Sequence, residues 1–280
     1  MPHIVELNAP LAVEQSAYRA TGFGELAAQA ERWMLTHADA VIVVSAELRK
    51  HVLSLGVKPG KIHVLPNGVN TSLFQPGKPD PALRRKLKLN DGPVLGFVGG
   101  LRPWHGVEIL PELLARLSRR HRGVRLVIVG DGQLRRELER RFQKRGLAKQ
   151  VVFTGALPHE EIPAVIRQFD IALAPYPKPD HDFYFSPLKL FEYMACGAPV
   201  LAANLGQISE VVRDVKTGLL YPPGNLNALV ARCEKLLGDS KLRAAIGKAS
   251  AKLVQSKFTW DRNAAVVVKL AKKLKAGRRK

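Results

Sequence analysis

Residues Phe183–Val200, which read FYFSPLKLFEYMACGAPV, give the strongest structural signal in the chain. They predict a loop that leads into a short helix, because turn-forming residues give way to helix-forming and apolar ones. Gly197 ends this helix, and Pro199 opens a strand directly after it. A helix followed at once by a buried strand is typical of an α/β protein with a parallel sheet.

The start of this predicted helix suits an anion. Ser186 is a good N-cap, and Pro187 fits the first helical position. The backbone N–H groups of Leu188 and Lys189 then lie at the positive end of the helix, where a nucleotide diphosphate would be stabilised. We therefore predict that these four residues bind such a group.

Glu192 lies about one and a half turns into the same helix. Its neighbours are mostly apolar, and a charged side chain among apolar ones needs a partner. We predict that its carboxylate accepts hydrogen bonds from a ribose diol. A solvated helix carboxylate is the alternative interpretation.

Outward from this segment, short apolar runs alternate with amphipathic stretches of helical length. Such runs are typical of parallel strands buried on both faces, and their alternation with helices predicts right-handed crossovers. The predicted strands are Val41–Ser45, Ile62–Leu65, Val94–Gly99, Val124–Gly130, Val151–Thr154, Ile171–Pro175, Pro199–Ala203 and Gly218–Tyr221.

Two glycine-containing turns follow predicted strands. The first, Gly99–Gly106, reads GGLRPWHG and leads into a helix, so its backbone can approach an anion closely. Within it, Gly99, Gly100, Arg102 and His105 are candidates for binding phosphate, although a simple tight turn with His105 as a helix cap is the alternative.

The second turn, Gly130-Asp131-Gly132, resembles the beginning of a dinucleotide fingerprint. Arginines stand where the third glycine belongs, and the following strand does not end in an acidic residue. We therefore exclude an NAD site and predict that Gly130 and Asp131 line the same cleft as the first turn.

Composition narrows the class of partner. The net charge of +20 favours an anionic membrane surface, a phosphate-bearing substrate or nucleic acid. Nucleic acid is disfavoured because no zinc-finger spacing or RNA-binding strand motif accompanies the charge. The two cysteines form no disulfide framework, and no signal peptide or bilayer-spanning run is evident, so a cytoplasmic protein is expected.

These segments resemble the C-terminal domain of glycosyltransferase family 4, which has the GT-B architecture. The resemblance runs from Gly92 to the end of the chain. The segment Val41–Phe74 resembles the last part of the family's N-terminal domain, and Phe258–Trp260 resembles the start of its closing helix.

The resemblance implies an α/β fold of GT-B type, with one complete C-terminal Rossmann-like doubly wound parallel sheet and a partial, N-terminally truncated Rossmann-like domain. The implied boundaries are 1–75 for the partial domain, 76–91 for a linker, 92–257 for the nucleotide-sugar-binding domain, and 258–280 for the crossover helix and basic tail.

The function implied is transfer of a sugar, with retention of configuration and without an essential metal or cofactor, from a nucleotide-diphosphate donor to a saccharide or lipid-linked acceptor. It implies a cytoplasmic protein, peripheral at the inner face of an anionic membrane. A catalytically incomplete nucleotide-sugar-binding fragment or subunit is the first alternative, and a basic nucleic-acid-binding protein is the second.

By position, Glu192 matches the second glutamate of the family's E-x7-E motif, which holds the ribose. The first glutamate falls on Tyr184, so Asp182 is the nearest carboxylate that could replace it. The family's usual arginine and lysine fall on Gly100 and His105.

These replacements leave Arg102 and Lys189 as the expected cations beside the leaving diphosphate. No residue of the family's N-terminal site can be assigned firmly, and the candidates there are His3, Glu6, Asn8, Glu14 and Gln15.

Overall fold

The computed structural model describes residues 2–10, 24–89, 91–178 and 183–277. The chain divides into two compact units. Unit 1 comprises Met1–Gly68, His181–Pro187 and Phe258–Lys280, and unit 2 comprises Val69–Asp180 and Leu188–Lys257. Asp182, Glu14 and Gln15, which were candidate site residues, lie outside the described residues.

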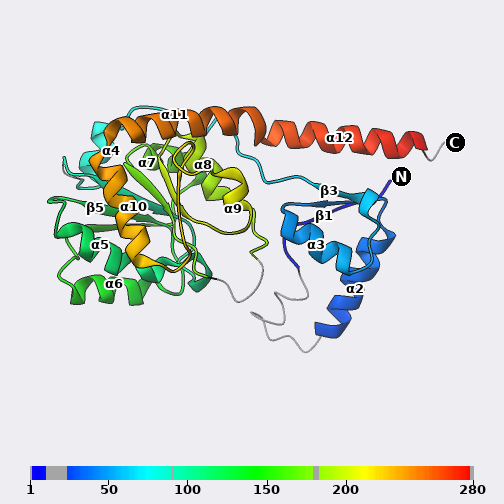
Figure 1. Cartoon of the computed structure of the whole chain (residues 1–280), viewed down its shortest axis with the longest axis horizontal. Coiled ribbons are helices and arrows are strands. Elements are labelled where there is room, and N and C mark those ends of the chain that lie inside the picture. Colours follow the sequence, from blue (N-terminus) through cyan, green and yellow to red (C-terminus); the bar gives the residue numbers. More distant parts are fainter. Residues whose placement is uncertain (1, 11–23, 90, 179–182, 278–280) are drawn as a thin grey trace. The chain divides into compact units, whose positions relative to one another are not determined.

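Unit 1 is built on a three-stranded parallel sheet in the order β1-β2-β3 (Figure 1). The strands are β1 (Ile4–Leu7), β2 (Ala40–Val43) and β3 (Ile62–Val64), and the helices are α2 (Gly24–His37), α3 (Ala46–Ser54) and α12 (Trp260–Gly277). The core joins the sheet to α2 and α3, and Tyr184 is buried in it. Strand β1 was not predicted, because four residues of mixed polarity give too short a pattern.

Helix α12 contacts the backbone of the segment that follows β3. The Asn263 side-chain amide donates to the Pro66 carbonyl oxygen at 2.8 Å. A Cβ atom on Gly68 would lie 2.6 Å from the backbone nitrogen of Trp260, so only glycine allows this approach. The segment that follows β3 is thus fixed against the start of α12.

Unit 2 contains a six-stranded parallel sheet in the order β6-β5-β4-β7-β8-β9. The strands are β4 (Val94–Val98), β5 (Arg125–Val129), β6 (Val151–Gly155), β7 (Ile171–Ala174), β8 (Val200–Ala203) and β9 (Leu219–Tyr221). The α-helices are α4 (Pro81–Lys86), α5 (Leu110–Ser118), α6 (Arg135–Lys144), α7 (Ile162–Ile166), α8 (Leu188–Ala195), α9 (Gly206–Val211), α10 (Leu226–Gly238) and α11 (Ser240–Lys257). This strand order confirms the predicted doubly wound C-terminal sheet.

The segment 76–91, predicted as a linker, clusters with unit 2 and contains α4. Arg167 donates to the Gln75 carbonyl oxygen at 3.0 Å, and the Gln168 side chain donates to the Asp80 carbonyl oxygen at 3.2 Å. These contacts attach the segment to the turn before β7. Its proline and glycine residues therefore mark a structured surface segment.

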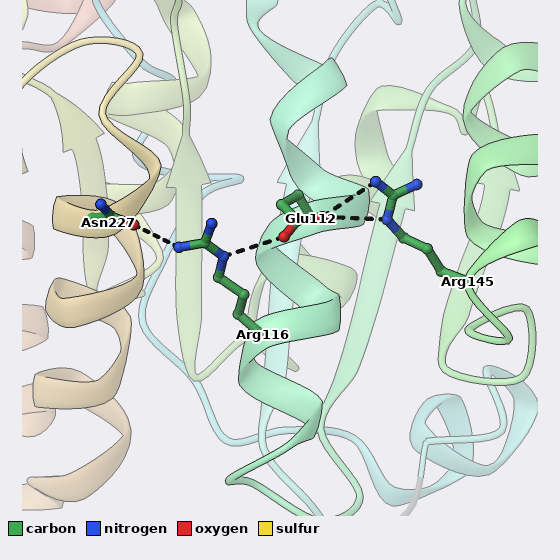
Figure 2. Close-up of polar contacts among 4 residues, drawn as sticks. All are labelled: Glu112, Arg116, Arg145 and Asn227. Atoms are coloured by element: carbon green, nitrogen blue, oxygen red, sulfur yellow. Dashed lines mark hydrogen bonds and ion pairs between the residues drawn. The ribbon is translucent and has the colours of Figure 1, made fainter.

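One face of unit 2 is tied together by Glu112 on α5 (Figure 2). Its carboxylate accepts from Arg116 on the same helix and from Arg145 at the end of α6, both at 3.2 Å. Arg116 also donates to Asn227 on α10. These hydrogen bonds lower the pKa of Glu112, so the network links three helices through ionised groups.

No helix in the described ranges is both long enough and apolar enough to cross a bilayer. Both cysteines are free and buried, and burial raises the pKa of the Cys196 thiol to about 12.

Candidate functional site

The strand order of unit 2 has a switch point between β4 and β7. The chain proceeds from β4 to β5 and β6 on one side, then returns to add β7, β8 and β9 on the other. Ligands of open α/β sheets bind beside the carboxyl ends of the strands at such a point. The turn Gly99–Gly106 follows β4, and Pro175 and Tyr176 follow β7.

The two predicted glycine turns pack against each other. A Cβ atom on Gly130 would lie 2.1 Å from the Gly99 carbonyl oxygen, so the close approach requires glycine. The Leu101 amide donates to the Asp131 carbonyl oxygen at 2.9 Å. The Asp131 carboxylate is engaged by Arg135 at 3.1 Å. Gly130 and Asp131 therefore pack directly against the first turn.

Lys189 occupies the space beside the first turn. Its Nζ atom would lie 2.8 Å from a Cβ atom on Gly99, and it lies 4.5 Å from the Phe97 ring centroid and 5.1 Å from that of Tyr176. The residue is 8% exposed, and its amine has no hydrogen-bond partner among the described residues. A buried amine needs a hydrogen-bond acceptor or an anion as a partner, and the two rings supply only cation–π contacts.

Burial lowers the pKa of the Lys189 amine to about 7, and the Glu192 carboxylate opposes this shift. At neutral pH the amine is thus divided between its charged and neutral forms. An anion placed beside it would favour the charged form.

His105 packs beside the glycine turn, and its surroundings disfavour the charged imidazole. Burial, and then the positive charges of Lys189 and Arg102, lower its pKa to about 4. Its Nδ1 atom lies 2.6 Å from the Gly100 carbonyl oxygen, so Nδ1 carries the proton and donates. His105 therefore holds the glycine turn and supplies no positive charge at neutral pH.

Glu192 is partly buried, and its Oε1 atom lies 3.2 Å from Nε2 of His159. His159 opens the short 3-10 helix η4 (His159–Glu161) after β6. Its ring packs on that of Phe74, with 5.0 Å between centroids. The carboxylate is held by one imidazole and retains acceptor capacity for a ligand.

Arg102 is exposed, and its guanidinium lies over the Trp104 ring at 5.2 Å. Stacking leaves the edge of the guanidinium available to phosphate oxygens. The predicted site residues of unit 2 thus form two groups. The turn after β4 carries Gly99, Gly100, Arg102 and His105, and α8 carries Lys189 and Glu192.

Of the remaining predicted residues, Leu188 is the first residue of α8 in unit 2, whereas Ser186 and Pro187 are grouped with unit 1. The boundary between the units therefore passes between Pro187 and Leu188. The Ser186 hydroxyl was predicted to cap α8, but it accepts from the Asn67 backbone N–H at 3.0 Å in unit 1. Tyr184, at the position of the first family glutamate, is buried in the unit 1 core, where its carbonyl oxygen accepts from Ser45.

The candidates near the start of the chain belong to unit 1. His3 donates its backbone N–H to Asp39 at 2.6 Å, and Asn8 donates to Glu6 at 3.3 Å. His3, Glu6 and Asn8 are all exposed, and these contacts lie within unit 1.

Sequence reasoning missed His159 and Tyr176. Each follows a strand of unit 2 directly or after a short loop, which is where ligand-binding residues of a parallel sheet lie. That position was the available signal, but it does not show which side chain turns toward Lys189 or Glu192.

Comparison with known proteins bears on both units. The sequence model of the family described as Glycosyl transferases group 1 matches residues 79–253, and the one described as Glycosyltransferase Family 4 matches residues 3–73. The first match covers more than half of the chain.

Individual relatives agree. The chain is similar to the GDP-mannose-dependent alpha-(1-6)-phosphatidylinositol monomannoside mannosyltransferase of Mycolicibacterium smegmatis, at 32% identity over 83% of this chain and 62% of that protein. It is similar to the D-inositol 3-phosphate glycosyltransferase of Acidothermus cellulolyticus, at 31% identity over 91% of this chain and 56% of that protein. The chain therefore spans less than two thirds of the length of these relatives.

Among solved structures, sucrose-phosphate synthase from Thermosynechococcus elongatus superposes with a TM-score of 0.80 at 27% identity, over 98% of this chain and 68% of that one. This likeness confirms the expected GT-B type of fold. The family matches and the order of the strands agree, and the chain belongs to the glycosyl transferases group 1 family.

Proposed function

We propose that this chain transfers a sugar from a nucleotide-diphosphate donor to a saccharide or lipid-linked acceptor. The observation that carries the proposal is the buried amine of Lys189, which has no described hydrogen-bond partner and lies beside Gly99. A diphosphate on the glycine turn would supply the missing partner.

The donor's parts correspond to distinct residues. The diphosphate would lie against the Gly99–Gly100 turn and the first amides of α8, with Lys189 beneath it. The ribose would lie against Glu192, one turn further along α8. The name of the mycobacterial relative includes a GDP-mannose donor and a phosphatidylinositol glycan, which supports a nucleotide sugar and a lipid-linked acceptor here.

Catalysis would depend on the departure of the nucleoside diphosphate. Negative charge grows on that leaving group as the bond to the sugar breaks, and groups already positioned there lower the barrier. Among the described residues, Lys189 and Arg102 are the cations on α8 and on the turn after β4 that we propose for this role. Because they can neutralise the diphosphate, we propose a reaction that needs no essential metal, with retention of configuration as the family resemblance implies.

The net charge of the chain supports our proposal for the acceptor and the location. The excess of basic residues, +20 in total, suits a chain at the anionic inner face of a membrane, where a lipid-linked acceptor would also be found. We therefore propose peripheral attachment on the cytoplasmic side.

Thermal shift with UDP, GDP and ADP tests donor binding, because a ligand that binds only the folded state raises its stability. We expect at least one to raise the melting temperature of the wild type. Lys189→Met should reduce that shift, and Lys216→Met, which changes an exposed lysine of unit 2, should leave it unchanged.

Release of labelled sugar from the matching donor then tests turnover, with saccharide or lipid acceptors supplied. Transfer supports the enzyme. Binding without any transfer supports the donor-binding fragment or subunit, and failure of every nucleoside diphosphate to bind overturns both.

A further inference from the structure

His159 contacts Glu192 from a different element of unit 2. Its Nε2 atom lies 3.2 Å from Oε1 of the carboxylate, across a sequence separation of 33 residues. The two side chains differ in accessibility, because that of His159 is 60% exposed and that of Glu192 is 14% exposed. An exposed imidazole thus reaches inward to a partly buried acid.

The imidazole is itself held in place. The ring packs on that of Phe74, which is fully buried. His159 is also the first residue of η4 and directly follows Pro158. Proline restricts the backbone before η4, and the aromatic contact restricts the ring. Together with the hydrogen bond to Glu192, the Phe74 contact gives the imidazole two partners that orient it.

We infer that His159 is a positioning residue, which fixes the Glu192 carboxylate so that its second oxygen meets the ribose hydroxyls of the donor. This inference rests on the proposed function, since it needs a nucleotide beside Glu192. It adds a role for a residue outside the predicted site.

Hydrogen-bond chemistry decides which oxygen is left for the ligand. Nε2 faces a carboxylate oxygen, so it carries the proton and donates to Oε1. Oε2 then remains as the acceptor with the larger free capacity. A ribose diol offers two donors, and a carboxylate whose rotation is prevented loses less entropy when it binds them.

The arrangement also predicts which nucleotides bind. A 2′-deoxyribose offers one hydroxyl fewer, so a fixed acceptor loses one of its hydrogen bonds and discriminates against it. Without His159 the carboxylate can rotate and bind water instead. Discrimination between ribose and deoxyribose should then decrease together with affinity.

A purely structural tie between η4 and α8 is the alternative, and three variants separate the two. His159→Leu removes the N–H donor but keeps an apolar side chain that can still pack on Phe74. His159→Gln keeps an N–H donor at the end of a shorter side chain. Glu160→Gln changes an exposed residue of the same short helix and serves as the matched control.

The measurements are KM and kcat for the nucleotide-sugar donor, and dissociation constants for matched ribose and 2′-deoxyribose nucleoside diphosphates. We expect His159→Leu to raise KM for the donor about 5- to 20-fold with kcat changed less than about 3-fold, because uniform binding is lost. We expect it to reduce the ribose preference by a similar factor. His159→Gln should recover most of both, and Glu160→Gln should match the wild type.

An unchanged ribose preference in His159→Leu would overturn the inference, even if its melting temperature fell. Equal effects of the Leu and Gln variants would also overturn it, because the donor N–H would then be irrelevant. Failure of the wild type to bind any nucleoside diphosphate is a different result, since it rejects the proposed function itself.

Discussion

The amine of Lys189 lies 4.5 Å from the ring centroid of Phe97, so a cation on α8 is stacked on a residue of β4. Two rings and no described hydrogen-bond acceptor surround it. The charged state of this amine therefore depends on whether an anion is present, which makes both ligand binding and stability dependent on pH.

Donor affinity should decrease as the pH rises above neutrality. In the empty site the Lys189 pKa is about 7, and a bound diphosphate raises it, so binding takes up a proton above pH 7. The affinity should fall by up to about tenfold per pH unit until the pKa of the bound state is reached. Isothermal titration with a nucleotide sugar, whose diphosphate keeps its charge across this range, measures the effect.

Two variants control that experiment. Lys189→Met should bind weakly with no such pH dependence, and Lys189→Arg should bind with a flat profile because guanidinium stays protonated. A wild-type affinity that is constant between pH 6 and pH 9 would contradict the prediction.

Lys189 should also make the folded chain less stable at low pH than at high pH. Its pKa is about 7 when folded, below the ordinary value of 10.5, so the unfolded chain binds more protons between these values. The contribution of this group to the free energy of unfolding therefore rises with pH across that window.

Urea unfolding of the wild type and Lys189→Met at several pH values measures the difference between them. The variant should be more stable than the wild type below pH 7, and the gap should narrow toward pH 10. A gap that does not depend on pH would show that the amine is not desolvated in the folded state.

Glu192→Ala should weaken donor binding by ~1–3 kcal/mol, because two ribose hydroxyls lose their acceptor. Removing this partly buried carboxylate also leaves His159 without its hydrogen-bond partner. The melting temperature of the variant must therefore be measured together with its affinity. Glu160→Ala, in the exposed part of η4, is the comparison. Unchanged affinity would remove Glu192 from the site.

Arg102→Ala should reduce kcat by about tenfold or more while donor KM changes little, because charge on the leaving diphosphate develops in the transition state. The exposed guanidinium makes no described contact that holds the fold other than stacking on Trp104, so stability should change little. Arg136→Ala, another exposed arginine of unit 2, is the control. A rise in KM with normal kcat would instead assign Arg102 to ground-state binding.

Gly106→Ala should be much more destabilising than Gly146→Ala. Both glycines have φ of 69°, so alanine is strained equally at each. A Cβ atom on Gly106 would lie 1.9 Å from the Pro175 carbonyl oxygen, whereas nothing lies within 4 Å at Gly146. Chemical unfolding should show a loss of about 1–2 kcal/mol at Gly146, and more at Gly106. Equal losses would mean that the turn after β4 can move away from β7.

Much of unit 2 could be predicted because its strands are buried on both faces and therefore appear as continuous apolar runs. Helix α8 was predicted from its ends, because Pro187 precedes its first residue and Gly197 follows its last turn. Strand β1 was missed, because in Ile4–Leu7 the outward-facing glutamate breaks a pattern of only four residues.

The chemistry of the site was only partly predictable. Lys189 and Glu192 stand in a recognisable segment, but the rings around Lys189 come from β4 and from the turn after β7. Their meeting depends on the order of the strands, which the local sequence does not encode. For the same reason His105 was a candidate anion ligand in sequence, whereas its burial makes it a neutral support for Gly100.

The hydroxyl of Tyr193 accepts a hydrogen bond from the Val98 backbone N–H at 2.6 Å, which connects α8 to the last residue of β4. This hydrogen bond restrains the helix that carries Lys189 relative to the strand that precedes the glycine turn. Within unit 2, a nucleotide would meet a preorganised seat, and crystal structures with and without it should differ there only in side-chain rotamers.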